Sequence, residues 1–274
     1  MPELPEVETV ANSLRRHVLG RRIEAIEVRE ARLRQAVDGA RLRDHLLGRS
    51  FIAIERRAKY LIFTTDAETA MLVHLGMSGR LGVVRASQPL QKHDHILWRL
   101  AGDYELRFND PRRFGFVDSC SLGALPEHPR LRDLGVEPLG EAFNGAALYT
   151  MTRKSKKPIK NFLMDGRRIV GVGNIYACES LWQARIHPNT AAGTLSPERC
   201  ERLGEAVRTI LKAAIEQGGT TLRDFADADG RAGYFAISLH AYGRDGEACT
   251  RCGAAIKRVV HAGRGTFYCP GCQR

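Results

Sequence analysis

The chain has 274 residues, more than one typical domain requires and enough for two or three small ones. Hydrophobic residues make up 43% and charged residues 27%, which is typical of a soluble globular protein with apolar cores. No apolar run is long enough to cross a membrane, and the N-terminus does not have the pattern of a signal peptide. We therefore expect a cytoplasmic protein without a membrane partner.

The charge balance is strongly basic, with a formal net charge of +11. Lysine and arginine displace the counterions condensed on phosphates, so this excess favours a polyanion partner such as nucleic acid. Solubility alone would also account for it, and the placement of the charges has to decide between the two.

The first predicted element is an amphipathic helix over residues 5–19. Val7, Val10 and Leu14 fall on one face, and Gly20 ends the helix.

Residues 23–117 change to short β-rich runs separated by Gly and Asp, which favours a β-sandwich or a barrel. The runs cover residues 51–54, 60–63, 71–75, 95–100 and 105–108. Residues 101–103 predict a hairpin turn, and the Pro- and Gly-rich residues 119–140 predict a linker.

The next third of the chain is predicted to be helical. Ser196-Pro197-Glu198 is typical of a helix start, and apolar residues keep helical spacing from there to the glycines at 218–219. A second helix is predicted over residues 174–184, directly after Gly171-Val172-Gly173.

Four of the seven cysteines lie close to the C-terminus as two Cys-x-x-Cys pairs separated by sixteen residues. The pairs are Cys249 with Cys252 and Cys269 with Cys272. This spacing predicts one structural Zn²⁺ held by four thiolates, whereas free thiols or an iron–sulfur cluster are the alternatives. A module this small would take its folding energy from the metal.

Two basic segments are candidates for phosphate contact. Residues 243–274 carry six Lys or Arg against two acids, including Arg264 between the cysteine pairs. Residues 153–160, which include Lys156, form a dense basic run shortly before the glycines at 171–173 and Asn174, where a helix N-terminus exposes backbone N–H groups. The alternatives are a solvated face for the run and an ordinary turn with Asn174 as N-cap.

The N-terminal sequence Met1-Pro2-Glu3-Leu4-Pro5-Glu6-Val7-Glu8 is followed by five further motifs and the four-cysteine tail. The motifs are RRAKY at 56–60, HLGMSG at 74–79, DPRRFG at 110–115, GVGNIY at 171–176 and EQGGTT at 216–221. In this order they resemble the bacterial formamidopyrimidine-DNA glycosylase family, the 8-oxoguanine DNA glycosylase/lyases.

The resemblance implies an α+β multidomain fold. A leading helix and a β-sandwich would form a catalytic domain over residues 1–135. A helical domain of the helix-two-turn-helix type, with a lesion-recognition loop, would cover residues 136–240, and a zinc finger residues 241–274. The partner would be damaged double-stranded DNA, and we expect a monomeric protein associated with the nucleoid.

The resemblance also implies that Pro2 is the nucleophile. Removal of Met1 exposes a secondary amine, and an α-amino group with a pKa of roughly 8 is partly unprotonated at neutral pH. Attack at the sugar C1′ expels the base, and the resulting iminium is an electron sink for β-elimination and, in the family, δ-elimination.

Three further catalytic residues are implied in the same way. Glu3 corresponds to the general acid/base of the family, Lys59 to its active-site lysine and Arg264 to the arginine that holds the phosphates during elimination. The alternatives are a partner for the helix dipole at Glu3 and an ordinary solvent-exposed lysine at Lys59.

The remaining implied residues contact DNA. The phosphate or DNA contacts implied in this way are His74, His93, Arg112, Asn174 and Tyr242, and Lys156 is a further candidate from the basic run. Met77, Arg112 and Phe114 would fill the space left by a flipped base, unless Met77 and Phe114 are core residues of the sandwich. Glu6, Thr220 and Thr221 would recognise the lesion, the threonines from a glycine-rich loop at 216–234.

Two other functions fit part of the pattern. A non-catalytic zinc-finger DNA-binding protein explains the charge and the cysteines but does not explain Pro2-Glu3 together with Lys59. An endonuclease VIII-like enzyme for oxidised pyrimidines would have the same architecture, but the Leu4 context favours the purine enzyme. Nothing specific supports an RNA-binding module.

Overall fold

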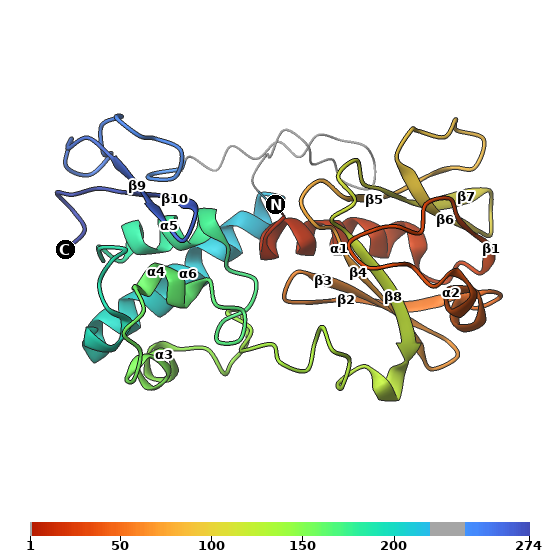
Figure 1. The fold of residues 1–274 in the computed structure, drawn as a ribbon, viewed down its shortest axis with the longest axis horizontal. Coiled ribbons are helices and arrows are strands. Elements are labelled where there is room, and N and C mark those ends of the chain that lie inside the picture. The colour runs from red at the N-terminus through yellow and green to blue at the C-terminus, as the bar shows by residue number, and fades with distance from the viewer. Residues whose placement is uncertain (1, 220–238) are drawn as a thin grey trace. The chain divides into compact units, whose positions relative to one another are not determined.

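The computed structural model describes residues 2–219 and 239–274 (Figure 1). The described residues form two compact units, one of residues 2–132 with 218–219 and one of residues 133–217 with 239–274. No helix within the described ranges is both long and apolar enough to span a membrane.

The first unit begins with α1 (Leu4–Val18), which buries one apolar stripe that includes Val7, Leu14 and Val18. Gly20 follows the helix with a φ of +74°, a conformation that glycine adopts without steric cost. The helix contacts strands of both sheets described next, so the N-terminal residues are anchored on the core of this unit.

Two antiparallel four-stranded sheets follow α1 in the first unit. One has the order β1 (Ile23–Val28), β6 (Asp94–Leu100), β7 (Tyr104–Asn109), β5 (Arg80–Arg85). The other has the order β2 (Phe51–Arg57), β3 (Tyr60–Thr65), β4 (Thr69–His74), β8 (Phe116–Ser121). A short helix α2 (Gly39–Leu46) and the 3₁₀ turn η1 (Leu122–Ala124) complete the unit.

One apolar core joins the two sheets and α1. Phe51 and Phe63 of one sheet, Trp98 and Phe108 of the other, and Leu14 of α1 are all fully buried in the same cluster. Burying bulky side chains from both inner faces is what makes a sandwich stable. The predicted sandwich with a leading helix is therefore confirmed.

The second unit contains helices and the cysteine module. Its helices are α3 (Gly145–Thr152), α4 (Ile159–Leu163), α5 (Asn174–Gln183) and α6 (Pro197–Glu216), with the 3₁₀ turn η2 (Ala192–Thr194). Ser196 caps α6 by accepting from Arg199 N at 3.3 Å. A hairpin of β9 (Lys257–His261) and β10 (Arg264–Tyr268) packs against α5 (Figure 1).

The predicted elements agree with the structure where apolar residues recur with regular spacing over a long segment, or where Gly and Asp residues mark a turn. The hairpin turn at 101–103 joins β6 to β7, with Gly102 and Asp103 both at positive φ. The helix α2 within the β-rich region, the short helices α3 and α4, and strands β1 and β5 were not predicted individually. The linker prediction for residues 119–140 was wrong at its start, because β8 continues to Ser121 by pairing with β4.

Candidate active site and zinc centre

Pro2 and Glu3 lie buried at the start of α1. Glu3 is the N-cap of the helix, with extended backbone and only 3% exposure. Its backbone N–H donates to Glu6 Oε2 at 2.8 Å, which forms one half of a capping box. A carboxylate from the first turn therefore fixes the backbone directly after Pro2.

Lys59 lies in the two-residue turn between β2 and β3, and not within a strand. Ala58 before it has a φ of +56°. Arg56 donates to Ala58 O at 3.0 Å and to Glu8 Oε2 at 2.8 Å. The arginine thus ties the turn that carries Lys59 to the helix that begins beside Pro2.

His74 ends β4, and its ring is neutral. Nδ1 accepts a hydrogen bond from Gly76 N at 2.9 Å. Desolvation, together with the positive charges of Lys59, Arg34 and Arg130, lowers the pKa of His74 to about 4. The single proton therefore resides on Nε2, which is the tautomer that can donate to a phosphate oxygen.

Met77, Arg112 and Phe114 come from two loops of the first unit. Met77 is 40% exposed, Phe114 is 44% exposed and Arg112 is also exposed. The guanidinium of Arg112 lies 4.8 Å from the centre of the Phe114 ring. Gly76 has a φ of +65°, and a Cβ there would lie 2.5 Å from the backbone of Phe114, so the two loops pack backbone against backbone.

A buried carboxylate holds these two loops together. Asp110 accepts from Ser78 Oγ at 2.8 Å and from Gly115 N at 2.7 Å. Ser78 Oγ in turn accepts from Arg112 N at 3.3 Å, while His93 O accepts from Asp110 N at 3.1 Å. Asp110 therefore positions the backbone of both loops and of His93, although its side chain is fully buried.

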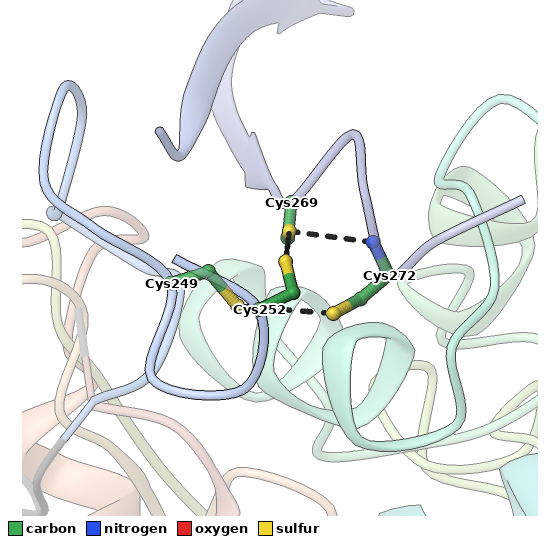
Figure 2. Close-up of side chains that lie close together, drawn as sticks. All are labelled: Cys249, Cys252, Cys269 and Cys272. Atoms are coloured by element: carbon green, nitrogen blue, oxygen red, sulfur yellow. Dashed lines mark hydrogen bonds between the residues drawn. The ribbon is translucent and has the colours of Figure 1, made fainter. Parts of the chain in front are cut away.

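The four cysteines of the second unit converge on one point (Figure 2). All four sulfurs lie within 4.8 Å of one another, and the separations Cys249–Cys272 and Cys252–Cys269 are 3.9 and 3.4 Å. These distances exceed an S–S bond of about 2 Å and fit the roughly 3.8 Å edge of a tetrahedron of sulfurs at 2.3 Å from Zn²⁺. Four thiolates would fill the coordination sphere of Zn²⁺ and leave no position for water, so the site is structural.

Three family models match successive parts of the chain. They are the formamidopyrimidine-DNA glycosylase N-terminal domain at residues 1–117, its H2TH domain at 134–226, and the zinc finger found in FPG and IleRS at 246–274. The formamidopyrimidine-DNA glycosylases of Alcanivorax borkumensis and Acidithiobacillus ferrooxidans are each 50% identical to this chain, and each comparison covers 100% of both proteins. The chain belongs to the formamidopyrimidine-DNA glycosylase family.

Solved structures of the family agree over the full length. A complex between the Lactococcus lactis Fpg and DNA containing an abasic site has a TM-score of 0.92, 36% identity and 99% coverage of both chains. A structure of MutM with DNA containing carbocyclic 8-oxo-G has a TM-score of 0.91, 36% identity and 100% coverage of both chains. The predicted family, its domain types and the four-cysteine zinc finger are therefore confirmed.

In this glycosylase Glu6 contacts the start of the predicted lesion-recognition loop. Gly219 has a φ of +90°, and a Cβ there would lie 3.1 Å from Glu6 Cγ. Glu6 thus holds the backbone after Pro2 and lies against a residue near the start of this loop. Thr220 and Thr221 lie outside the described residues, as does Met1.

Arg264 lies exposed at the start of β10, and the second unit holds the backbone next to it. Gly265 O accepts from Asn174 Nδ2 at 3.0 Å and from Lys160 Nζ at 3.3 Å. Lys160 Nζ also donates to Thr266 Oγ1 at 2.6 Å. Two side chains from the helices therefore fix the hairpin strand that carries Arg264.

Glu179 of α5 was not singled out from the sequence, and it positions Tyr242. The buried carboxylate accepts from the backbone N–H groups of His240, Ala241 and Tyr242 at 2.9, 2.9 and 2.7 Å. The Tyr242 ring packs edge-on against Phe267 of β10, with centroids 5.0 Å apart. Glu179 is the only charged residue of α5, and a carboxylate within an otherwise uncharged helix is the sequence signal that could have revealed it.

The basic run at 153–160 is not a uniform surface patch. Lys160 is buried, Lys157 pairs with Asp165 at 2.9 Å, and Arg153 donates to Leu195 O at 2.6 Å. Lys156 is exposed, which leaves it accessible to a phosphate. The N-cap alternative for Asn174 was wrong, because Gly173 caps α5 and the side chain of Asn174 binds β10.

Proposed function

We propose that this glycosylase removes oxidised purines, 8-oxoguanine and formamidopyrimidines, from duplex DNA and then cuts the abasic strand by β,δ-elimination. The observation that carries the proposal is the buried Pro2-Glu3 start of α1, with Glu6 holding the Glu3 backbone at 2.8 Å. Relatives of full-length similarity have been solved with abasic-site and Fapy-dG DNA, which supports this choice of substrate. From the DNA substrate we infer that the protein acts in the cytoplasm, at the nucleoid.

Pro2 is the nucleophile of the proposed reaction. Its secondary amine forms a bond to C1′ and loses its N–H proton, while the base departs with the electrons of the glycosidic bond and takes up that proton. Glu3 donates a proton to the sugar ring oxygen as the ring opens, which leaves an iminium between Pro2 and C1′. Loss of a proton from C2′ then expels the 3′ phosphate, and a second elimination expels the 5′ phosphate.

Lys59 and Arg264 serve the later steps. The Arg56–Glu8 pair holds the Lys59 turn against α1, which pre-organises an ammonium for proton transfer near the N-terminus. Arg264 binds the phosphates that leave, because a guanidinium offers two donors in fixed geometry. The four cysteines hold one structural Zn²⁺, which stabilises the module that carries Arg264.

The DNA contacts complete the proposal. Base flipping costs a few kcal/mol, and Met77, Arg112 and Phe114 occupy the space left in the helix. His74, His93, Lys156, Asn174 and Tyr242 contact the backbone. Glu6, Thr220 and Thr221 contact the flipped base.

The decisive experiment is borohydride trapping on duplex DNA with a single 8-oxoguanine, followed by peptide mapping. We expect a covalent complex whose cross-link maps to Pro2 in protein that has lost Met1. The matched control is protein that retains Met1, in which the Pro2 nitrogen is an amide and should give no trapped complex. A cross-link on Lys59, or no complex with any damaged duplex, would contradict the proposal, and the latter result would favour a plain DNA-binding protein. Trapping on an oxidised pyrimidine in preference to 8-oxoguanine would favour the endonuclease VIII-like alternative.

A further inference from the structure

Trp182, near the end of α5, belongs to the apolar core of the zinc finger. It is 3% exposed and clusters with Ala241, Cys249, Ile256 and Cys269. The finger itself contributes the buried Ile256 and the partly buried Phe267, beside alanines and cysteines. Its core is therefore completed by an aromatic residue from a helix far away in the sequence.

The indole of Trp182 makes a direct contact with a zinc ligand. Nε1 donates to Cys249 Sγ at 3.4 Å. The His240 ring stacks on the indole with centroids 4.3 Å apart and an interplanar angle of 9°. The Arg251 guanidinium lies over the same indole at 3.7 Å from its centre.

Both residues between the first two cysteines reach this aromatic group. Arg251 donates to Trp182 O at 2.8 Å in addition to its contact with the ring. Thr250 Oγ1 lies 3.2 Å from Nδ1 of His240, the ring that stacks on Trp182. In the first Cys-x-x-Cys turn, Cys249 and Arg251 therefore contact Trp182 of α5 directly, and Thr250 reaches it through His240.

We propose that Trp182 is a positioning residue of the zinc site, which orients the Cys249 thiolate and makes metal retention depend on helix α5. A hydrogen bond to a ligating atom fixes the direction of its lone pairs and lowers the cost of bringing four negative sulfurs together. The stacked His240 and Arg251 fix the plane of the indole, so the N–H remains directed at the sulfur. The zinc finger is therefore not an independent module but one that shares its metal environment with the helical domain.

Zinc release from the purified full-length protein tests the proposal. Trp182→Phe keeps an aromatic ring and removes the N–H donor, and Trp98→Phe is the matched control. Trp98 is the other tryptophan of the chain; it is buried in the first unit, and its Nε1 has no hydrogen-bond partner among the described residues. Loss of an outer-shell partner costs about 10- to 100-fold in metal affinity. We expect zinc transfer to a chromogenic chelator to be about 10-fold faster or more for Trp182→Phe, and unchanged for Trp98→Phe. Equal release from wild type and Trp182→Phe would overturn the proposal.

Fluorescence provides a second readout that does not depend on how well Trp182→Phe folds. In Trp98→Phe the only tryptophan emission comes from Trp182. Removal of zinc by a chelator should shift and change the intensity of that emission, and adding Zn²⁺ back should restore it. An emission spectrum that is the same with and without zinc would show that Trp182 does not sense the metal site, and the proposal would fail.

Discussion

The Phe114→Ala variant tests whether Phe114 is a wedge, a side chain that inserts between the base pairs of DNA, or an ordinary core residue of the sandwich. A fully buried Phe contributes about 1.5–3 kcal/mol by transfer from water, and the cavity left behind raises the cost of its loss to about 3–5 kcal/mol. Phe114 is 44% exposed, so its replacement by Ala loses only about half of this transfer free energy. Water can enter the space left by the ring, so no empty cavity remains. We therefore expect a loss of about 1 kcal/mol in the free energy of unfolding. At about 3 °C per kcal/mol, the melting temperature should fall by about 3 °C.

The matched control is Phe108→Ala, since Phe108 is a fully buried residue of the same sandwich. It should lose about 3–5 kcal/mol. Calorimetric melts compare the two variants, and strand cleavage compares their activities. Phe114→Ala should excise 8-oxoguanine poorly yet still cut a ready-made abasic site, where no base has to be extruded. A stability loss equal to that of Phe108→Ala, or equal loss of both activities, would refute the wedge assignment.

Three further predictions concern the same unit. Glu3→Gln should lose base excision and keep part of the cleavage of abasic DNA, because Pro2 can still condense with an open aldehyde. Gel assays with 8-oxoguanine DNA and abasic DNA measure the two activities. Equal loss of both would indicate a structural role for Glu3. Ser78→Ala removes the hydroxyl that joins Asp110 to Arg112 N, so urea denaturation should show a loss of about 1–3 kcal/mol, whereas the exposed Ser87→Ala should show almost none. The pKa of His74 is about 4 in the folded protein and about 6.5 in the unfolded chain, so the stability it contributes is present above pH 6.5 and is lost as the pH falls toward 4. Between pH 8 and pH 5 this amounts to about 2 kcal/mol, and His74→Gln should flatten the pH dependence of urea melts by that amount if the argument is correct.

Much of the local structure follows from sequence pattern alone. Helices α1 and α6 could be predicted because their apolar residues keep helical spacing over several turns and their ends are marked by capping residues or glycines. The cysteine spacing predicts the zinc ligands, because each Cys-x-x-Cys turn brings its two sulfurs to one side. The short helices α3 and α4, with 8 and 5 residues, were not predicted because a period cannot be established over one or two turns. Helix α2 was missed within a β-rich region for the same reason.

The sequence by itself therefore determined the family, the zinc ligands and the residues proposed for catalysis, since these are carried by motifs whose members are close together in the chain. The tertiary structure alone showed which residues hold that machinery in place. Asp110, Glu179 and Lys160 belong to residue types that are usually exposed, yet each is buried and binds groups presented by the local fold. The contact between Trp182 and Cys249 spans 67 positions in the sequence. Such partners are brought together only when the elements pack. Hydrogen bonds and burial depend on distance in space, so they produce no regular pattern in the sequence.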